Sequence, residues 1–347
     1  MRILLGNQTL AMLAGSETWT ATLARALKKA GHDVTCFSPV LGIISKSLEK
    51  DGIRCIDDVG GGVRPFSFVL EPSVPEDFDF ILSNHHDITT ILRDRFPDKT
   101  IVSTIHGVLH TMRDQHGNEV PAPEHPAVGK ADIFVAVSEE VQAKLKADYS
   151  LSSAIIRNFF DLSALKAERP PSDGKPKQFL VNTNYAGRDD AEIKVVREVA
   201  KHFGAKLAAV GINFTPTDDV RLAIEDADVV FGMGRSVLEG VAMGCLGIVH
   251  GRWGTGGVVN EKNVNVLRAC NFSGRNSGGD VWSAERMIRE IEENYRPETM
   301  AWSSAYVARE HSADKAAAEY VMLGSATRQE KPPAPAPLPK LKFQSHA

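Results

Sequence analysis

The sequence predicts an α/β fold of two doubly wound, Rossmann-like domains that face each other across a cleft. Short apolar runs alternate with helix-like segments along most of the chain, which is the pattern of a parallel sheet covered by helices on both faces. The 347 residues are also more than one hydrophobic core usually organises. A proline-rich, charged stretch interrupts the alternation near the middle of the chain, where a domain boundary would lie.

The N-terminal domain is expected to span residues 1–165. A strand at residues 2–5 precedes a helix at 17–30, in which apolar residues recur three and four positions apart. Ser16 is the predicted N-cap of this helix, and Gly31 is predicted to end it. The remaining strands of the domain are predicted at residues 33–37, 53–56, 78–82, 100–105, 132–137 and 154–156, and its helices at 87–95 and 139–147.

Residues 166–176 hold three prolines, a glycine and five charged residues, so they are expected to form a linker. The C-terminal domain is expected at 177–295, and residues 296–326 are expected to form helices that cross back to the N-terminal domain. Residues 327–347 are expected to be a disordered, proline-rich tail. Within these bounds the sequence predicts strands at 178–182, 206–210, 228–231 and 246–250, and helices at 189–202, 219–225, 236–243, 283–294 and 302–323.

Composition narrows the class of protein. The 40 Lys and Arg residues against 44 Asp and Glu residues provide no general basic surface, so nucleic acid is not an expected partner. The four cysteines are scattered, which argues against a disulfide framework and a zinc site and favours a reducing cytoplasm. Residues 3–5 are too short an apolar run for a signal or a membrane span, so we expect a soluble protein, with association at a membrane surface left open.

One predicted strand-to-helix turn carries residues suited to an anion. Gly234, Arg235 and Ser236 lie there. A glycine lets the backbone approach a phosphate, a helix N-terminus adds a partial positive charge, and arginine can bind a phosphate through two hydrogen bonds. The sequence therefore predicts a phosphate site, the alternative being that the glycines only shape the turn.

Several short motifs occur in an order that resembles the GT-B glycosyltransferases, specifically the retaining, family 4-like enzymes of group 1. The motifs are AGSE at residues 14–17, Ser138 after a predicted strand, NFFD at 158–161 and the segment ADVVFGMGRSVLEGVAMGCLGIVHG at 227–251. The resemblance covers about residues 2–260. It implies metal-independent transfer of a sugar, with retention, from a nucleotide-sugar donor to a glycan, lipid or small-molecule acceptor, as in polysaccharide biosynthesis, with no cofactor beyond that co-substrate.

The resemblance also implies roles for donor-domain residues. Glu239 matches the second glutamate of the family's pair and would accept hydrogen bonds from the ribose hydroxyls. Phe231 stands eight positions earlier, where the family has its first glutamate. Arg188 and Lys194 would neutralise the leaving diphosphate. Alternatively, Arg188 pairs with one of the two aspartates that follow it, and Lys194 is a solvated helix residue.

Three further positions follow from the same resemblance. Gly15 lies in the family's first glycine-rich turn and would contact the donor. His106 ends a predicted strand and would face the donor sugar, the alternative being a loop histidine satisfied by the backbone. Residues 254–257 resemble a glycine-rich loop of the family, but Asn260 takes the slot of its acid, so Glu261 is expected at the surface. No metal ligands are expected.

Two other functions remain open at this stage. A nucleotide-sugar-binding protein that has lost turnover would explain Phe231, and a nucleotide-sugar epimerase would turn over donor without an acceptor. A NAD-dependent dehydrogenase is disfavoured because GNQTLAMLAG, not a tight G-x-G-x-x-G turn, follows the first strand. The sequence does not identify the nucleotide base, the sugar, the acceptor or the oligomeric state.

Overall fold

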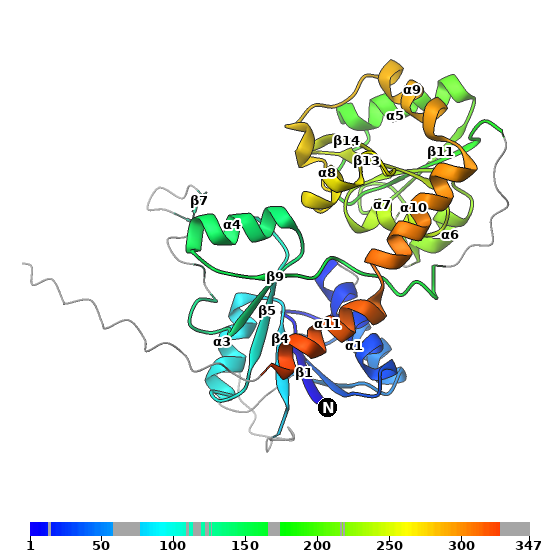
Figure 1. Ribbon diagram of the computed structural model, residues 1–347. Coiled ribbons are helices and arrows are strands. Elements are labelled where there is room, and N and C mark those ends of the chain that lie inside the picture. Colours follow the sequence, from blue (N-terminus) through cyan, green and yellow to red (C-terminus); the bar gives the residue numbers. More distant parts are fainter. Residues whose placement is uncertain are drawn as a thin grey trace, which may run out of the picture.

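The computed structural model describes residues 1–12, 15–57, 77–108, 111–113, 119–121, 125, 127–165, 174–215, 217 and 219–326. It contains two α/β units, each built on a mostly parallel sheet with helices on its faces (Figure 1). The predicted fold class is therefore confirmed. Most of the predicted linker, residues 166–173, and the predicted tail, 327–347, lie outside the described residues.

The N-terminal unit has a parallel sheet in the order β3-β2-β1-β4-β5-β8-β9. Its central strands are buried apolar segments such as FILS and IVSTI, as expected for strands covered on both faces. The strands are β1 Arg2–Gly6, β2 Asp33–Phe37, β3 Arg54–Ile56, β4 Phe80–Ser83, β5 Ile101–Ile105, β8 Ile133–Ala136 and β9 Ala154–Ile155, with a separate antiparallel pair, β6 Thr111–Arg113 and β7 Glu119–Pro121. The helices are α1 Gly15–Lys29, α2 Ile43–Lys50, α3 His86–Arg95 and α4 Glu139–Tyr149.

Helix α1 begins earlier than the sequence predicts. Its first residue is Gly15, so Ser16 lies inside the helix rather than at its N-cap, and the Ser16 hydroxyl donates to the carboxylate of Glu17 at 2.9 Å. Gly31 does follow the helix, with a φ of +87° that glycine adopts without strain. Helix α2 is absent from the prediction because its eight residues are too few to show a helical period.

The C-terminal unit has a sheet in the order β11-β10-β12-β13-β14, parallel except for β14. Its strands are β10 Gln178–Asn182, β11 Lys206–Val210, β12 Val229–Gly232, β13 Leu246–Gly251 and β14 Gly254–Val258. Its helices are α5 Ala191–Phe203, α6 Val220–Glu225, α7 Arg235–Ala242, α8 Val264–Ala269 and α9 Ala284–Asn294, with a short 3-10 helix, η1, at Arg275–Ser277.

The glycine-rich segment at residues 254–257, which the sequence suggested was a loop, is part of strand β14. Close packing explains its composition. A Cβ atom on Gly254 would lie 2.1 Å from the hydroxyl of Ser277, and one on Gly256 would lie 2.8 Å from the side chain of Asn276. Glycine is therefore needed to fit the strand against its neighbours, although its low strand propensity hides the strand in the sequence.

The predicted helix at 302–323 is two helices. Helix α10, Pro297–Glu310, ends before His311, and Ser312 caps helix α11, Ala313–Ser325. Helix α10 packs on α7 in the C-terminal unit, whereas α11 packs against α1, β4 and β5 in the N-terminal unit (Figure 1). The apolar period runs through both helices, so only the serine cap marked the break.

Gly324 fixes how closely α11 approaches the N-terminal sheet. A Cβ atom at this position would lie 2.2 to 2.5 Å from ring atoms of Phe80. We expect Gly324→Ala to lower the free energy of unfolding by about 2 kcal/mol, because the helix or the ring must shift. Urea unfolding measures this. Gly107→Ala, where a Cβ meets nothing within 4 Å, is the control; equal stability of both variants would contradict the close docking of α11.

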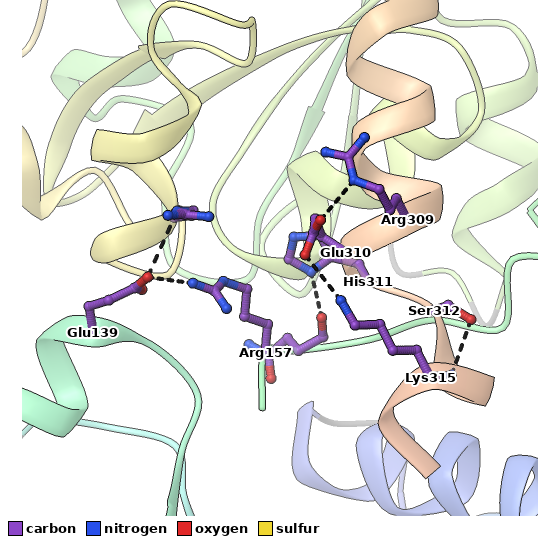
Figure 2. A network of polar contacts seen from close by, with 9 residues as sticks. Glu139, Arg157, Arg309, Glu310, His311, Ser312 and Lys315 are labelled. Atoms are coloured by element: carbon purple, nitrogen blue, oxygen red, sulfur yellow. Dashed lines mark hydrogen bonds and ion pairs between the residues drawn. The ribbon is translucent and has the colours of Figure 1, made fainter. Parts of the chain in front are cut away.

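The chain crosses between the two units twice, and the crossings are bonded to each other. The amide of Phe160 donates to the carbonyl of His311 at 2.8 Å, and the amide of Ala313 donates to the carbonyl of Phe160 at 2.9 Å. The buried His311 ring donates from Nδ1 to the carbonyl of Asn158 at 2.6 Å (Figure 2). The two crossings therefore form one junction.

Ion pairs join the two units beside this junction. Glu139, at the start of α4, pairs with Arg157 and lies 3.8 Å from Arg268 of α8 (Figure 2). The neighbouring Glu140 accepts hydrogen bonds of 2.9 and 3.0 Å from the guanidinium of Arg275. The N-terminal end of α4 is thus tied to the C-terminal unit by two carboxylates.

Candidate active site

His106 lies at the carboxyl end of β5, in a network of polar side chains from neighbouring strand ends. Asn84 follows β4 and donates from Nδ2 to Thr20 Oγ1 at 2.9 Å and to Asn7 Oδ1 at 3.2 Å. Its Oδ1 is therefore the atom that contacts His106 Nε2, at 3.1 Å. Because Oδ1 can only accept, the proton of His106 is on Nε2. A side-chain amide, not the backbone, thus holds the ring.

The His106 ring is neutral near pH 7. Burial, with a smaller contribution from the nearby His85, lowers its pKa to about 4. Trp19 packs against the ring edge to face, with centroids 5.2 Å apart. With the proton on Nε2, His106 Nδ1 is an acceptor, and within the described chain no hydrogen bond to it forms. His106 can therefore accept a hydrogen bond from a hydroxyl group, but it does not provide a positive charge at neutral pH.

In the C-terminal unit, Arg235 and Glu239 lie one turn apart on α7 and pair with each other. Arg235 donates to Glu239 Oε1 at 3.1 Å and to the carbonyl of Phe159 at 3.1 Å, and its guanidinium lies 4.8 Å above the Phe160 ring. Arg235, which the sequence predicted to bind a phosphate, thus contacts Phe159 and Phe160 where the chain crosses between the units. Glu239 Oε2 makes no hydrogen bond with the described residues, so this oxygen can accept one from a hydroxyl group.

The backbone at the start of α7 is also partly engaged. Gly234 has a φ of +55° and donates its amide to the carbonyl of Phe272 at 2.8 Å. The amide of Ser236 donates to the carbonyl of Met233 at 3.2 Å. The amides of Gly234 and Ser236 thus have backbone partners, so an anion at this turn would depend more on nearby cationic side chains.

Arg188 lies in the loop after β10, with its guanidinium 5.8 Å from the centre of the Phe214 ring. Within the described part of the chain, Arg188 forms no ion pair with Asp189 or Asp190, the alternative that the sequence left open. Asp190 instead accepts the amide of Gly187 at 2.7 Å. Lys194 is exposed on α5, and Gly15 is exposed at the start of α1 with open space where a Cβ would be. The structure therefore groups Arg235, Ser236 and Glu239 on α7 and leaves Gly15 and His106 on the other unit.

Phe231, which stands where the resembling family has an acid, is fully buried in the sheet. Its ring lies 5.6 Å from that of Phe179 and 6.2 Å from that of His250, centre to centre. Burying a carboxylate at this position would cost free energy, so the phenylalanine that replaces the family's glutamate fits the hydrophobic core. Glu261 is exposed, and Asn260 bonds to Asn294 at 2.8 Å.

Sequence reasoning missed Asn84, which contacts His106, and Asn7, which accepts a hydrogen bond from Asn84. The signal for the asparagines was available, because each directly follows a strand whose carboxyl end faces the same edge of the sheet. Among the described residues no group of three or more His, Cys, Asp or Glu side chains could hold a metal ion. No helix within the described ranges is both long and apolar enough to span a bilayer.

Residues 13–164 match the family model described as Glycosyltransferase Family 4. A glycosyltransferase from Rickettsia africae ESF-5 has a similar structure, with a TM-score of 0.60 and 14% identity over 93% of this chain and 97% of that chain. Anabaena Alr3699/HepE in complex with UDP and glucose gives a TM-score of 0.60 and 12% identity, over 93% of this chain and 99% of its own.

A putative UDP-N-acetylglucosamine 2-epimerase from Listeria monocytogenes is also similar, with a TM-score of 0.52 and 13% identity over 92% of this chain and 94% of that chain. No curated protein sequence matches the chain. The sheets, the order of the elements and these likenesses agree: the chain has the GT-B fold of glycosyltransferases, and its residues 13–164 match glycosyltransferase family 4.

Proposed function

We propose that this protein is a metal-independent, retaining glycosyltransferase that moves a sugar from a nucleoside diphosphate to an acceptor. The observation that carries the proposal is Glu239, a paired carboxylate with one oxygen open to a hydroxyl donor, at the carboxyl edge of the sheet in the second unit of a GT-B fold. Ligands of open parallel sheets bind at this edge. Crystal structures of Anabaena Alr3699/HepE with UDP and with UDP-glucose support a nucleotide-sugar donor.

In the proposed complex the C-terminal unit holds the donor. Glu239 Oε2 accepts a hydrogen bond from a ribose hydroxyl, and Arg188 meets the diphosphate, with Lys194 adding charge from α5. Negative charge grows on the diphosphate as the glycosidic bond breaks, so a cation there stabilises the transition state more than the bound donor. These two residues take the part that a metal ion has in other transferases.

The N-terminal unit supplies the other half of the proposed site. His106 Nδ1 accepts a hydrogen bond from a hydroxyl of the donor sugar, and Gly15 borders the donor at the start of α1. The acceptor, a glycan, a lipid or a small molecule, binds on this unit. In a retaining reaction the donor phosphate takes the proton of the attacking hydroxyl, so no side-chain base is assigned.

A panel of nucleoside diphosphate sugars, incubated with and without sugar or lipid acceptors, tests the proposal. We expect the nucleoside diphosphate to be released only when an acceptor is present, and proton NMR to show that the new glycoside keeps the donor's anomeric configuration. Conversion of the donor sugar to an epimer without acceptor would favour the 2-epimerase chemistry of the Listeria neighbour. Binding without turnover across the panel would favour a binding protein.

A further inference from the structure

Arg252 occupies the tight turn between β13 and β14, where two aromatic rings support its guanidinium. The guanidinium carbon lies 4.3 Å from the centre of the Trp253 ring and 5.1 Å from that of Tyr185. Both rings are partly open to solvent, Tyr185 at 66% and Trp253 at 37%. We call Tyr185, Arg252 and Trp253 the arginine platform. Rings at these distances hold a guanidinium by cation–π attraction and leave its N–H edge available.

The arginine platform lies beside the start of α7. Strand β12 stands between β10 and β13 in the sheet, and these three parallel strands end at the same edge. Tyr185 belongs to the loop after β10 and Arg252 to the turn after β13. Their contact therefore reaches across the end of β12. Helix α7, which carries Glu239, begins just after this strand. Arg188 is three residues beyond Tyr185 on the same loop.

Local hydrogen bonds fix both halves of the platform. The amide of Tyr185 donates to Thr183 Oγ1 at 3.2 Å, and Ser277 Oγ donates to the carbonyl of Trp253 at 3.1 Å. These bonds order the two backbone segments that carry the platform, which lowers the entropic cost of ordering them when a ligand binds.

Charge distinguishes the arginines at this edge. Arg235 is paired with Glu239, whereas neither Arg188 nor Arg252 forms an ion pair with any carboxylate of the described residues. An unpaired guanidinium is suited to a phosphate, which it binds through two charge-assisted hydrogen bonds. The amides of Gly234 and Ser236 are already bonded, so they are less available to an anion. The arginines without an ion pair to the described residues, Arg188 and Arg252, lie on the loops that flank this turn.

We propose that Arg252, rather than Arg235, is the guanidinium that binds the donor diphosphate opposite Arg188, and that Tyr185 and Trp253 are positioning residues for it. The inference rests on the proposed function. It assigns to Arg235 a different role, that of joining α7 to the chain crossing at Phe159 and Phe160.

Isothermal titration calorimetry tests the inference on the full chain. The probes are UDP, GDP and ADP, their parent nucleosides, and inorganic pyrophosphate. We expect Arg252→Gln to weaken binding of pyrophosphate and of the preferred nucleoside diphosphate by about 10-fold or more, because charge-assisted hydrogen bonds are lost, with the nucleoside unaffected. Arg197→Gln, at an exposed arginine of α5, is the matched control and should bind as the wild type does.

Tyr185 separates positioning from general disturbance of the loop. Tyr185→Phe keeps the ring beneath the guanidinium and should retain diphosphate affinity, whereas Tyr185→Ala should weaken it several-fold. Wild-type affinity in Arg252→Gln, or equal weakening for nucleoside and diphosphate, would overturn the role of Arg252 and leave the proposed function standing. A wild-type chain that binds none of the nucleoside diphosphates would overturn both.

Discussion

Replacing Glu239 by glutamine is expected to lower the affinity for a nucleoside diphosphate by about 100-fold. A hydrogen bond from a hydroxyl to an ionised carboxylate contributes about 1.5 to 3 kcal/mol, and the neutral amide also weakens the pairing with Arg235 that orients the side chain. The loss should come from the ribose. Calorimetric titration of the wild type and the variant with the preferred nucleoside diphosphate measures it.

A ribose analogue makes this experiment specific. The wild type should prefer the ordinary nucleoside diphosphate to its 2′,3′-dideoxy form, and Glu239→Gln should bind both alike. Glu198→Gln, at an exposed position of α5, serves as the charge-matched control. If the Glu239 variant still discriminated between the two nucleotides as the wild type does, the carboxylate would not contact the ribose.

Acidification is expected to destabilise the junction through His311. Burial is the main cause that lowers the pKa of this ring, to about 4, and nearby Arg157 and Lys315 add to it, while the bond to Asn158 and the charge of Glu310 act in the opposite direction. The unfolded chain takes up a proton near pH 6.5, so it gains protons before the folded chain does. Stability therefore falls as the pH drops from about 6.5 to about 4, by about 3 kcal/mol from this group.

Urea unfolding at several pH values measures this effect. The pKa of His106 is also lowered to about 4, and burial lowers the pKa values of His250 and His85, so the wild type alone does not separate His311 from these rings. His311→Gln should remove one share of the dependence, giving a shallower loss of stability between pH 6.5 and pH 4, while its stability at pH 7 also falls because the ring's packing is lost. If the stability of His311→Gln depended on pH as that of the wild type does, the lowered pKa of His311 would not contribute to the loss of stability in acid.

Local patterns predicted the sheets well because the relevant information lies within each strand and helix. Apolar runs such as 101–105 identify buried strands, and apolar residues three and four positions apart identify the buried face of the first helix. The break at His311 and strand β14 escaped prediction for a different reason. The continuous apolar period hides the break, which only the Ser312 cap marks, and the glycines of β14 are explained only by their close packing against Ser277 and Asn276.

The sequence predicted which strand ends carry the residues of the candidate site, but not which side chains and backbone groups those residues contact. That Arg235 bonds to Phe159, 76 residues away, follows only from how the chain crosses between the units. The contact of Tyr185 with Arg252 likewise joins two loops that are far apart in the sequence. They meet because β10 and β13, the strands before them, flank β12 and end at the same edge of the sheet. The position of Asn84 after a strand was visible in the sequence, but its hydrogen bond to His106 Nε2 was not.

The central claim is that a nucleoside diphosphate binds at the carboxyl edge of the C-terminal sheet, beside the start of α7. A crystal structure of the chain with the nucleoside diphosphate that binds most tightly tests this directly. We predict a ribose hydroxyl within hydrogen-bond distance of Glu239 and the diphosphate between Arg188 and Arg252. A nucleotide bound to the N-terminal unit alone, or bound at this edge with no contact to Glu239 or either arginine, would contradict the account.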